Sequence, residues 1–254
     1  MDDASVTAAT QRFYDAVARY NPELSFLNYG FVDPAVPASE PQPGDLVASC
    51  RRLYDTVLAP FPEVDRLLEV GCGRGGGAAF VLESRPVRRY LGLDLSREHV
   101  RMCRGRLRAY AHAGFAVADA VRLPVPAASF DAVFSIEAVH HFESRPRFYD
   151  EVAQSLRTGG QFFLASLWRT GEVESADTWA ACGFALAEQC DITPNVVASL
   201  ASTSDLRKRL VESLGLPDRL TPLLMSWVGV RGYDAFEGLR SGSLRYLRYR
   251  LVRT

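Results

Sequence analysis

The stretch LLEVGCGRGGG, residues 67–77, places a glycine-rich turn directly after a short apolar run. Gly71, Gly73 and Gly76 satisfy the pattern G-x-G-x-x-G, in which glycines let the backbone turn sharply and approach a ligand closely. Such a turn often joins a buried strand to a helix whose N-terminus faces a nucleotide-like cofactor. The pattern alone also fits a purely structural turn, so the flanking sequence must show whether the turn binds a cofactor.

The surrounding sequence alternates between short apolar runs and helical stretches. The apolar runs, which we interpret as strands, lie at 66–70, 89–94, 114–119, 130–136 and 161–168. Helical patterns fill the intervals, for example over 97–110 and 147–156. This alternation predicts an α/β fold with a parallel sheet that helices cover on both faces.

The two ends of the chain differ from this pattern. Helices are expected over 6–20 and 46–58, with a proline-rich loop over 34–44 between them. Residues 172–215 favour two or more helices with no strand between them. Two final strands are expected at 223–233 and 243–252, and their close spacing favours an antiparallel pair at the sheet edge.

Composition restricts the partners. The 254 residues carry 29 basic and 30 acidic side chains, a formal net charge of -1, and 48% of them are hydrophobic. A globular protein with this balance lacks the basic face that nucleic acid or an anionic membrane usually requires, so a small molecule is the expected partner. Five cysteines without a CxxC pair predict neither a disulfide framework nor a zinc site. The acidic N-terminus and the lack of a long apolar run predict a soluble, cytoplasmic protein.

Three acidic positions indicate the kind of cofactor. Asp94 ends the second strand, where a carboxylate can accept hydrogen bonds from both hydroxyls of a ribose. Glu69, two residues before the first glycine, suits a positively charged amino-acid tail better than a pyrophosphate. In Asp119-Ala120, the carboxylate can accept from an adenine amino group while the following amide donates to a ring nitrogen. Glu69 and Asp119-Ala120 therefore argue against a nicotinamide-dependent oxidoreductase.

A second group of polar residues, Glu137, His140 and His141, follows the fourth strand. A histidine in a cofactor cleft can take the proton of a hydroxyl nucleophile, and His140 is the first candidate. Each histidine could instead cap the next helix or orient Glu137. A metal site is not predicted, because the spacing matches no recognised set of ligands.

The sequence indicates a functional role less clearly for the other histidines and for the large aromatic residues. His99 and His112 are interpreted as surface or packing residues, although His99 could touch the cofactor. Four large aromatic residues could line an acceptor pocket, but core packing is the more common role for such side chains. They are Trp168, Trp179, Phe184 and Trp227.

The chain resembles the class I S-adenosylmethionine-dependent methyltransferases. The resemblance lies in LEVGCGRGGG, LGLDLS, DAVRLPVPAASFDAVFSIEAVHHF and the turn LRTGG. More narrowly, it is similar to the phthiotriol and phenolphthiotriol dimycocerosate methyltransferases and related natural-product methyltransferases. That likeness is carried by FLNYGFVDP, GCGRGGGAAF, EAVHHF and FEGLRSGSLRYLRY, and it fades between about 172 and 220.

The resemblance implies a Rossmann-like sheet of seven strands, mostly parallel with one antiparallel strand. It implies one domain with a helical cover over 1–60, a cofactor-binding core over 61–170, a helical lid over 171–220 and C-terminal strands over 221–254. The cofactor would be S-adenosyl-L-methionine and its product S-adenosyl-L-homocysteine.

If the family's cofactor-binding positions are transferred to this sequence, they correspond to residues of the core and of the N-terminal cover. The methionine end would lie near Glu69, Gly71 and Gly73, the ribose on Asp94, and the adenine between Leu95 and Asp119-Ala120. Tyr14 and the segment around Tyr29 would belong to the cover, and Cys72 and Ile136 would flank the cofactor. Val121 occupies a position where relatives often have an acid, so no role in adenine recognition is assigned to it.

The resulting hypothesis is methyl transfer to a small secondary-metabolite acceptor, with O-methylation favoured and His140 as general base, beside His141 and Glu137. N-methylation, C-methylation and a cofactor-dependent cyclase without methyl transfer are the alternatives, and a nicotinamide-dependent oxidoreductase is less favoured. A homodimer is left open.

Overall fold

The computed structural model describes residues 11, 14, 15, 18, 24–35, 42–59, 61, 63–215, 218 and 220–254. Of the helix expected over 6–20, only Gln11, Tyr14, Asp15 and Ala18 are described, and all four are helical. The rest of that helix and residues 36–41 of the expected loop lie outside the described residues. Within the described part of the chain, no helix is long and apolar enough to cross a membrane.

The described residues form a seven-stranded sheet in the order β3-β2-β1-β4-β5-β7-β6. Its strands are β1 (Val64–Val70), β2 (Val87–Asp94), β3 (Ala113–Val117), β4 (Phe130–Ile136), β5 (Leu156–Arg169), β6 (Phe184–Asp191) and β7 (Leu244–Arg253). β1 to β5 pair in parallel, whereas β7 runs antiparallel to both β5 and β6. The expected mostly parallel sheet with one antiparallel strand is confirmed.

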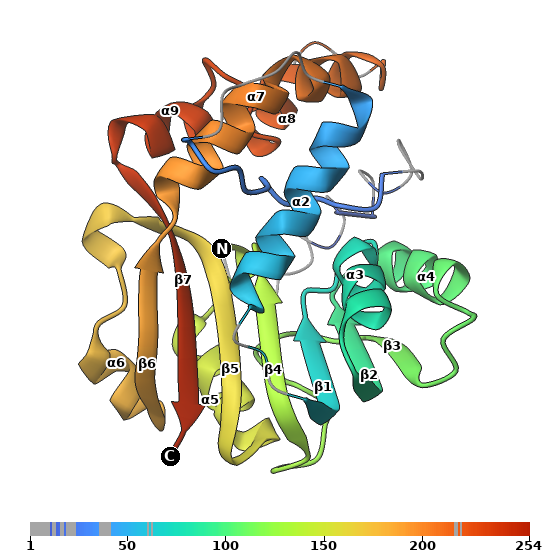
Figure 1. The fold of residues 1–254 in the computed structure, drawn as a ribbon, viewed down its shortest axis with the longest axis vertical. Coiled ribbons are helices and arrows are strands. Elements are labelled where there is room, and N and C mark those ends of the chain that lie inside the picture. Colours follow the sequence, from blue (N-terminus) through green and yellow to red (C-terminus); the bar gives the residue numbers. More distant parts are fainter. Residues whose placement is uncertain are drawn as a thin grey trace.

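Helices occupy both faces and one end of this sheet. They are α2 (Pro43–Val57), α3 (Gly76–Ser84), α4 (Arg97–Arg106), α5 (Arg145–Ser155), α6 (Ala176–Ala181), α7 (Thr193–Glu212), α8 (Thr221–Trp227) and α9 (Asp234–Ser241), with short 3₁₀ turns η1 (Val139–His141) and η2 (Thr170–Glu172). Figure 1 shows α7, α8 and α9 gathered above the sheet and α2 running in front of it. The strand order reverses between β1 and β4, which is where open α/β sheets bind their ligands.

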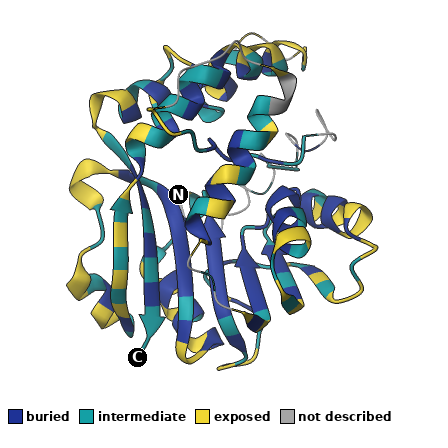
Figure 2. Ribbon diagram, in the orientation of Figure 1, coloured by how far each residue is buried: buried dark blue, intermediate teal, exposed yellow. Residues whose placement is uncertain are grey.

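The central strands are buried on both sides, as Figure 2 shows. Successive residues of one strand pack into different clusters: Leu67 and Phe163 belong to one, and Leu68 and Phe162 to the other. All four side chains are fully buried. A near-continuous apolar run therefore fills a core on each face, which is why these strands were recognisable from sequence.

Two expectations about the C-terminal half are wrong. Residues 184–191 form the edge strand β6, within a region expected to contain only helices. The helix-favouring Ala, Glu and Gln of FALAEQCD obscure an alternation that the structure shows as alternating burial. The region 171–220, expected as a helical lid, therefore contributes a strand as well as helices.

The strand expected at 223–233 is instead α8 and the loop after it. Pro222 lies in the first turn of this helix, where a missing N–H costs nothing, and Gly229 adopts φ +73° just beyond its end. A short, mostly apolar run does not distinguish a helix from a strand by periodicity. Residues 221–254 therefore contain α8, α9 and one strand, not two.

Candidate active site

A cleft that is partly open to solvent lies at the carboxyl ends of β1, β2 and β4. Every site residue expected from the sequence lines the cleft except Glu69. The lining members of that set are Tyr14, Tyr29, Gly71, Cys72, Gly73, Asp94, Leu95, Asp119, Ala120, Ile136, Glu137, His140 and His141.

The glycine-rich turn is fixed to the end of β2. Gly71 has φ +82°, and a Cβ atom there would lie 2.4 Å from the Cβ of Ala138, so only glycine fits. The amide of Gly73 donates to Oδ2 of Asp94 at 2.8 Å. The turn thus brings its backbone beside the carboxylate expected to bind a ribose.

Asp94 has two further partners, which the sequence did not predict. Its Oδ1 accepts from the amide of Ser96 at 2.9 Å and lies 3.2 Å from Nδ1 of His99. His99 is 2% exposed and lines the cleft, and its buried Nε2 has no hydrogen-bond partner among the described residues. The interpretation of His99 as a surface residue is wrong, whereas its packing role is confirmed. A buried ring nitrogen without a partner fits a ligand with a hydroxyl or amino group at this point.

Glu69 lies beneath the turn instead of in the cleft. It is fully buried, and its carboxyl group accepts hydrogen bonds from the hydroxyls of Tyr54, at 3.2 Å, and Tyr90. Burial raises the pKa of Glu69 to about 8. In this structure the acid supports the turn through Tyr54, which itself lines the cleft, and it is largely uncharged at neutral pH.

At the adenine end, Asp119 and Ala120 follow β3. Oδ1 of Asp119 accepts from the amide of Val121 at 3.1 Å, which fixes the carboxylate at the edge of the cleft. Ala120 is 8% exposed. Together with Leu95 these residues line the part of the cleft where an adenine ring is expected from the sequence.

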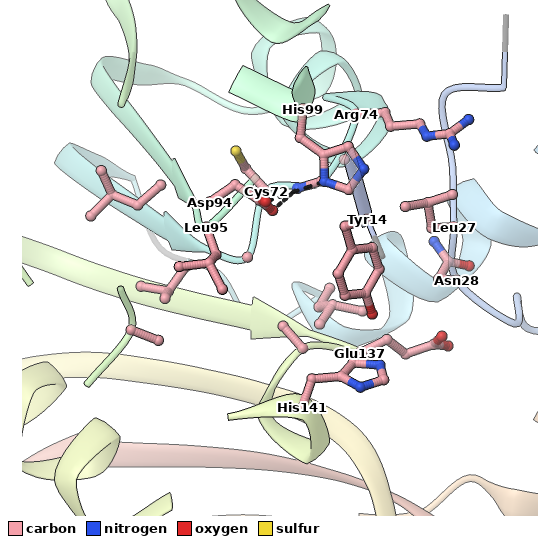
Figure 3. A pocket seen from close by; sticks show the side chains of 18 of the residues that line it. Tyr14, Leu27, Asn28, Cys72, Arg74, Asp94, Leu95, His99, Glu137 and His141 are labelled. Atoms are coloured by element: carbon pink, nitrogen blue, oxygen red, sulfur yellow. Dashed lines mark hydrogen bonds and ion pairs between the residues drawn. The ribbon is translucent and has the colours of Figure 1, made fainter. Parts of the chain in front are cut away.

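Tyr14 crosses the middle of the cleft. Its ring packs edge-on against His99 and His141, each at 5.6 Å between ring centres, and against Trp227 at 5.9 Å. Figure 3 shows the ring between His99 on one side and Glu137 with His141 on the other. The N-terminal segment thus contributes an aromatic wall between the two ends of the cleft.

A buried arginine holds the second N-terminal segment in place. Arg207 of α7 is 4% exposed and donates to the carbonyls of Asn28, Tyr29 and Val228 and to the hydroxyl of Thr203. Its guanidinium therefore joins α7, the end of α8 and residues 28–29 of the N-terminal cover. Sequence reasoning missed this residue because nothing local distinguishes it from a surface arginine of an amphipathic helix.

Glu137 has a strained backbone at the end of β4. Its φ of +54° lies in the left-handed region, which costs a non-glycine residue roughly 1–2 kcal/mol. Oε1 accepts from the amide of Tyr29 at 2.7 Å and from the hydroxyl of Tyr246 at 2.9 Å. Burial raises the pKa of Glu137 to about 7, against the lowering effect of these two donors. The carboxyl thus connects the cover to the sheet at the wall of the cleft.

The two histidines follow in η1. Nδ1 of His140 lies 2.7 Å from the hydroxyl of Ser166, a fully buried residue of β5, and the rings of His140 and His141 pack 3.9 Å apart. The His140 side chain lines the cleft and is exposed. Surrounding protein and His141 hold the pKa of His140 well below its usual range, and burial lowers that of His141 to about 4. Both rings are therefore neutral at pH 7.

The remaining aromatic candidates divide between core and cleft. Trp168, Trp179 and Phe184 are buried in the core, whereas Trp227 lines the cleft. No group of three or more His, Cys, Asp or Glu side chains that could hold a metal ion occurs among the residues that the structure describes. All five cysteines are free thiols.

Comparison with known proteins agrees with this geometry. Residues 68–164 match the family model described as a methyltransferase domain. A fatty-acid O-methyltransferase of Mycolicibacterium smegmatis is 33% identical over 91% of this chain and 84% of its own length. A phthiotriol/phenolphthiotriol dimycocerosates methyltransferase of Mycobacterium leprae is 34% identical over 72% of this chain and 68% of its own.

The fold comparison extends over almost the whole chain. The crystal structure of geranyl diphosphate C-methyltransferase from Streptomyces coelicolor, which contains S-adenosyl-L-homocysteine, superposes with a TM-score of 0.70 at 14% identity and covers 98% of each chain. Sequence, fold and the glycine-rich turn beside Asp94 thus agree on one cofactor, and this chain belongs to the S-adenosylmethionine-dependent methyltransferases that act on small molecules.

Proposed function

We propose that this enzyme methylates a hydroxyl oxygen of a small, largely apolar secondary metabolite, with His140 as the general base. The observation that carries the proposal is the position of the His140 ring, which lines the cleft and has its Nδ1 2.7 Å from the hydroxyl of Ser166. An O-methyltransferase among the relatives supports the choice of oxygen over nitrogen or carbon.

The chain's own residues would bind the cofactor along one side of the cleft. The amides of the glycine turn and the support from Glu69 would hold the methionine end. Asp94, with His99 behind it, would receive the ribose hydroxyls, and Leu95 with Asp119-Ala120 would hold the adenine. Tyr14 would then cover the centre, with Trp227 against it.

Bound S-adenosylmethionine supplies an electrophilic methyl group, whose bond to sulfur breaks as the new bond to oxygen forms. A neutral hydroxyl is a weak nucleophile, so the proton must leave as the oxygen attacks. With Nδ1–H donating to the Ser166 oxygen, Nε2 of the neutral His140 carries a lone pair that can take that proton. Tyr14, Trp227 and Phe142 surround this end of the cleft with apolar surface and so limit access of water.

The test is His140→Ala, assayed by release of S-adenosylhomocysteine with an acceptor found by screening hydroxylated compounds. Loss of a general base typically slows turnover by about 10²- to 10⁴-fold. Affinity for S-adenosylhomocysteine should change by less than about 3-fold, because the proposed role of His140 is confined to the acceptor. Turnover at the wild-type rate would contradict the proposed mechanism, and a small loss with an amine acceptor would favour N-methylation.

A further inference from the structure

The side chain of Glu137 is held so that only one of its carboxyl oxygens is available. Oε1 receives both hydrogen bonds, from the amide of Tyr29 and the hydroxyl of Tyr246. Within the part of the chain that the structure describes, Oε2 receives none. Because Glu137 lines the cleft, this second oxygen can bind a donor from a ligand.

Glu137 is also placed at the acceptor end of the cleft. It lies two residues before η1, and Figure 3 shows it beside His141, across the Tyr14 ring from His99 and Asp94. The backbone at this position is strained, and the side chain is held by hydrogen bonds from two distant segments, 108 and 109 residues away. Such strain is typically retained where a side chain must be presented in one direction.

The charges around this end disfavour an anion. Arg74 is the only lysine or arginine among the described residues that line the cleft, and Figure 3 shows its guanidinium near Leu27 and Asn28, away from His141. Arg207 is near enough to Glu137 to lower its pKa, but it is buried behind Tyr29 and bonded to four oxygens of the protein. Both histidines are neutral, and Glu143 adds another acid.

A diphosphate or carboxylate acceptor would therefore meet a carboxylate. Among the residues that the structure describes, no cation lines this end of the cleft and no cluster of metal ligands occurs. A hydroxyl next to the one being methylated would instead donate to Oε2. The apolar rings of Tyr14, Trp227 and Phe142 would pack against the rest of such a molecule.

We propose that the acceptor is a neutral apolar molecule with two neighbouring hydroxyls, one facing His140 for methylation and the other bound by Oε2 of Glu137. The inference rests on the proposed function. It makes Glu137 the residue that selects diols over single alcohols and excludes carboxylates, including acceptors of the kind named for the fatty-acid relative.

Three naphthalene probes that differ only in their polar group test this: a naphthol, the vicinal naphthalenediol and the naphthoate. Their dissociation constants are measured by calorimetry on the enzyme saturated with S-adenosylhomocysteine, at about pH 8, above the pKa of about 7 of Glu137. A hydrogen bond to a charged group should make the diol bind about 10-fold or more tighter than the naphthol. The naphthoate should bind most weakly.

Glu137→Gln supplies the decisive variant, because its amide oxygen can still accept from Tyr29 and Tyr246 while its NH₂ replaces Oε2. The diol preference should fall to within about 3-fold, and the naphthoate should gain affinity relative to the naphthol. Glu143→Gln, which removes a charge at an exposed position of the same cleft, is the matched control and should keep the diol preference.

Equal binding of diol and naphthol by the wild type, tightest binding of the naphthoate, or an unchanged diol preference in Glu137→Gln would overturn the inference. If Glu137→Gln does not fold, the wild-type ranking alone decides. Turnover with S-adenosylmethionine is measured separately. If the diol binds tightest but is never methylated, Glu137 is supported as the residue that binds a second hydroxyl, and O-methylation with His140 as base is contradicted. If the probes are methylated but bind equally well, the proposed function is supported and the role of Glu137 is contradicted.

Discussion

Replacing Glu69 by glutamine should remove much of the loss of stability that the wild type shows as the pH rises. Burial raises the pKa of this carboxyl from 4.5 to about 8. In the unfolded chain the group ionises above pH 4.5, whereas in the folded protein it keeps its proton up to about pH 8. Unfolding therefore releases a proton in this window, and stability falls by about 1.4 kcal/mol for each pH unit.

Between about pH 6 and pH 8, Glu69 alone should lower the free energy of unfolding by about 2.5 kcal/mol. Glu137, with a pKa of about 7, adds a smaller loss in the same direction. His140 and His141 act in the opposite direction, because their lowered pKa values make stability rise as pH increases through about 6.5. These contributions are common to both proteins and cancel in the difference.

The free energy of unfolding is measured by urea denaturation of wild type and Glu69→Gln at both pH values. The wild type should lose about 2 to 3 kcal/mol more than the variant. Glu83→Gln, which removes an exposed acid paired with Arg51, serves as the control and should follow the wild type. Equal losses in wild type and Glu69→Gln would refute the assignment of Glu69 as a buried, protonated support of the glycine turn.

Three further variants test other parts of the structure. Arg207→Met should lower the free energy of unfolding by roughly 3 kcal/mol, because several buried oxygens lose their donor. Arg231→Met, at an exposed position, is the control and should lower it by less than about 1 kcal/mol. If urea denaturation shows that the two variants differ by less than about 1 kcal/mol, the role of Arg207 is contradicted. Ser166→Ala should lower kcat by about 10-fold with little change in KM, since the His140 ring loses its orientation; an unaltered kcat would show that Ser166 is not needed. Asp94→Asn should weaken S-adenosylhomocysteine binding by about 10-fold in calorimetry, and unchanged affinity would remove Asp94 from the ribose site.

The core of the fold could be predicted because its strands are buried on both faces. The run that ends at Val70 is mostly apolar, and the glycine turn that follows has few alternatives once Asp94 ends the next strand. The edge strand β6 was missed because its pattern is half polar and its partner β7 lies more than fifty residues later in the sequence. A strand that depends on a distant partner leaves a weak local signal.

The sequence predicted residues that line the cleft themselves, but it did not predict residues that act by positioning another residue. The glycines and Asp94 belong to a continuous local pattern. Ser166, Arg207 and Tyr246 reach the site only through tertiary packing, and His99 becomes part of it because Ser96 caps α4 and places the ring beside Asp94. The Glu69 side chain is held by two tyrosines, Tyr54 and Tyr90, and no sequence spacing predicts that these residues meet.

The most direct test of the proposed function is the position of the transferred methyl group. The enzyme is incubated with a diol acceptor and S-adenosylmethionine labelled at the methyl carbon, and the product is examined by mass spectrometry and NMR. We predict a single label on oxygen, at one of two neighbouring hydroxyls, and an equal amount of S-adenosylhomocysteine. A label on nitrogen or carbon, or a rearranged product without label, would contradict O-methyl transfer in this cleft.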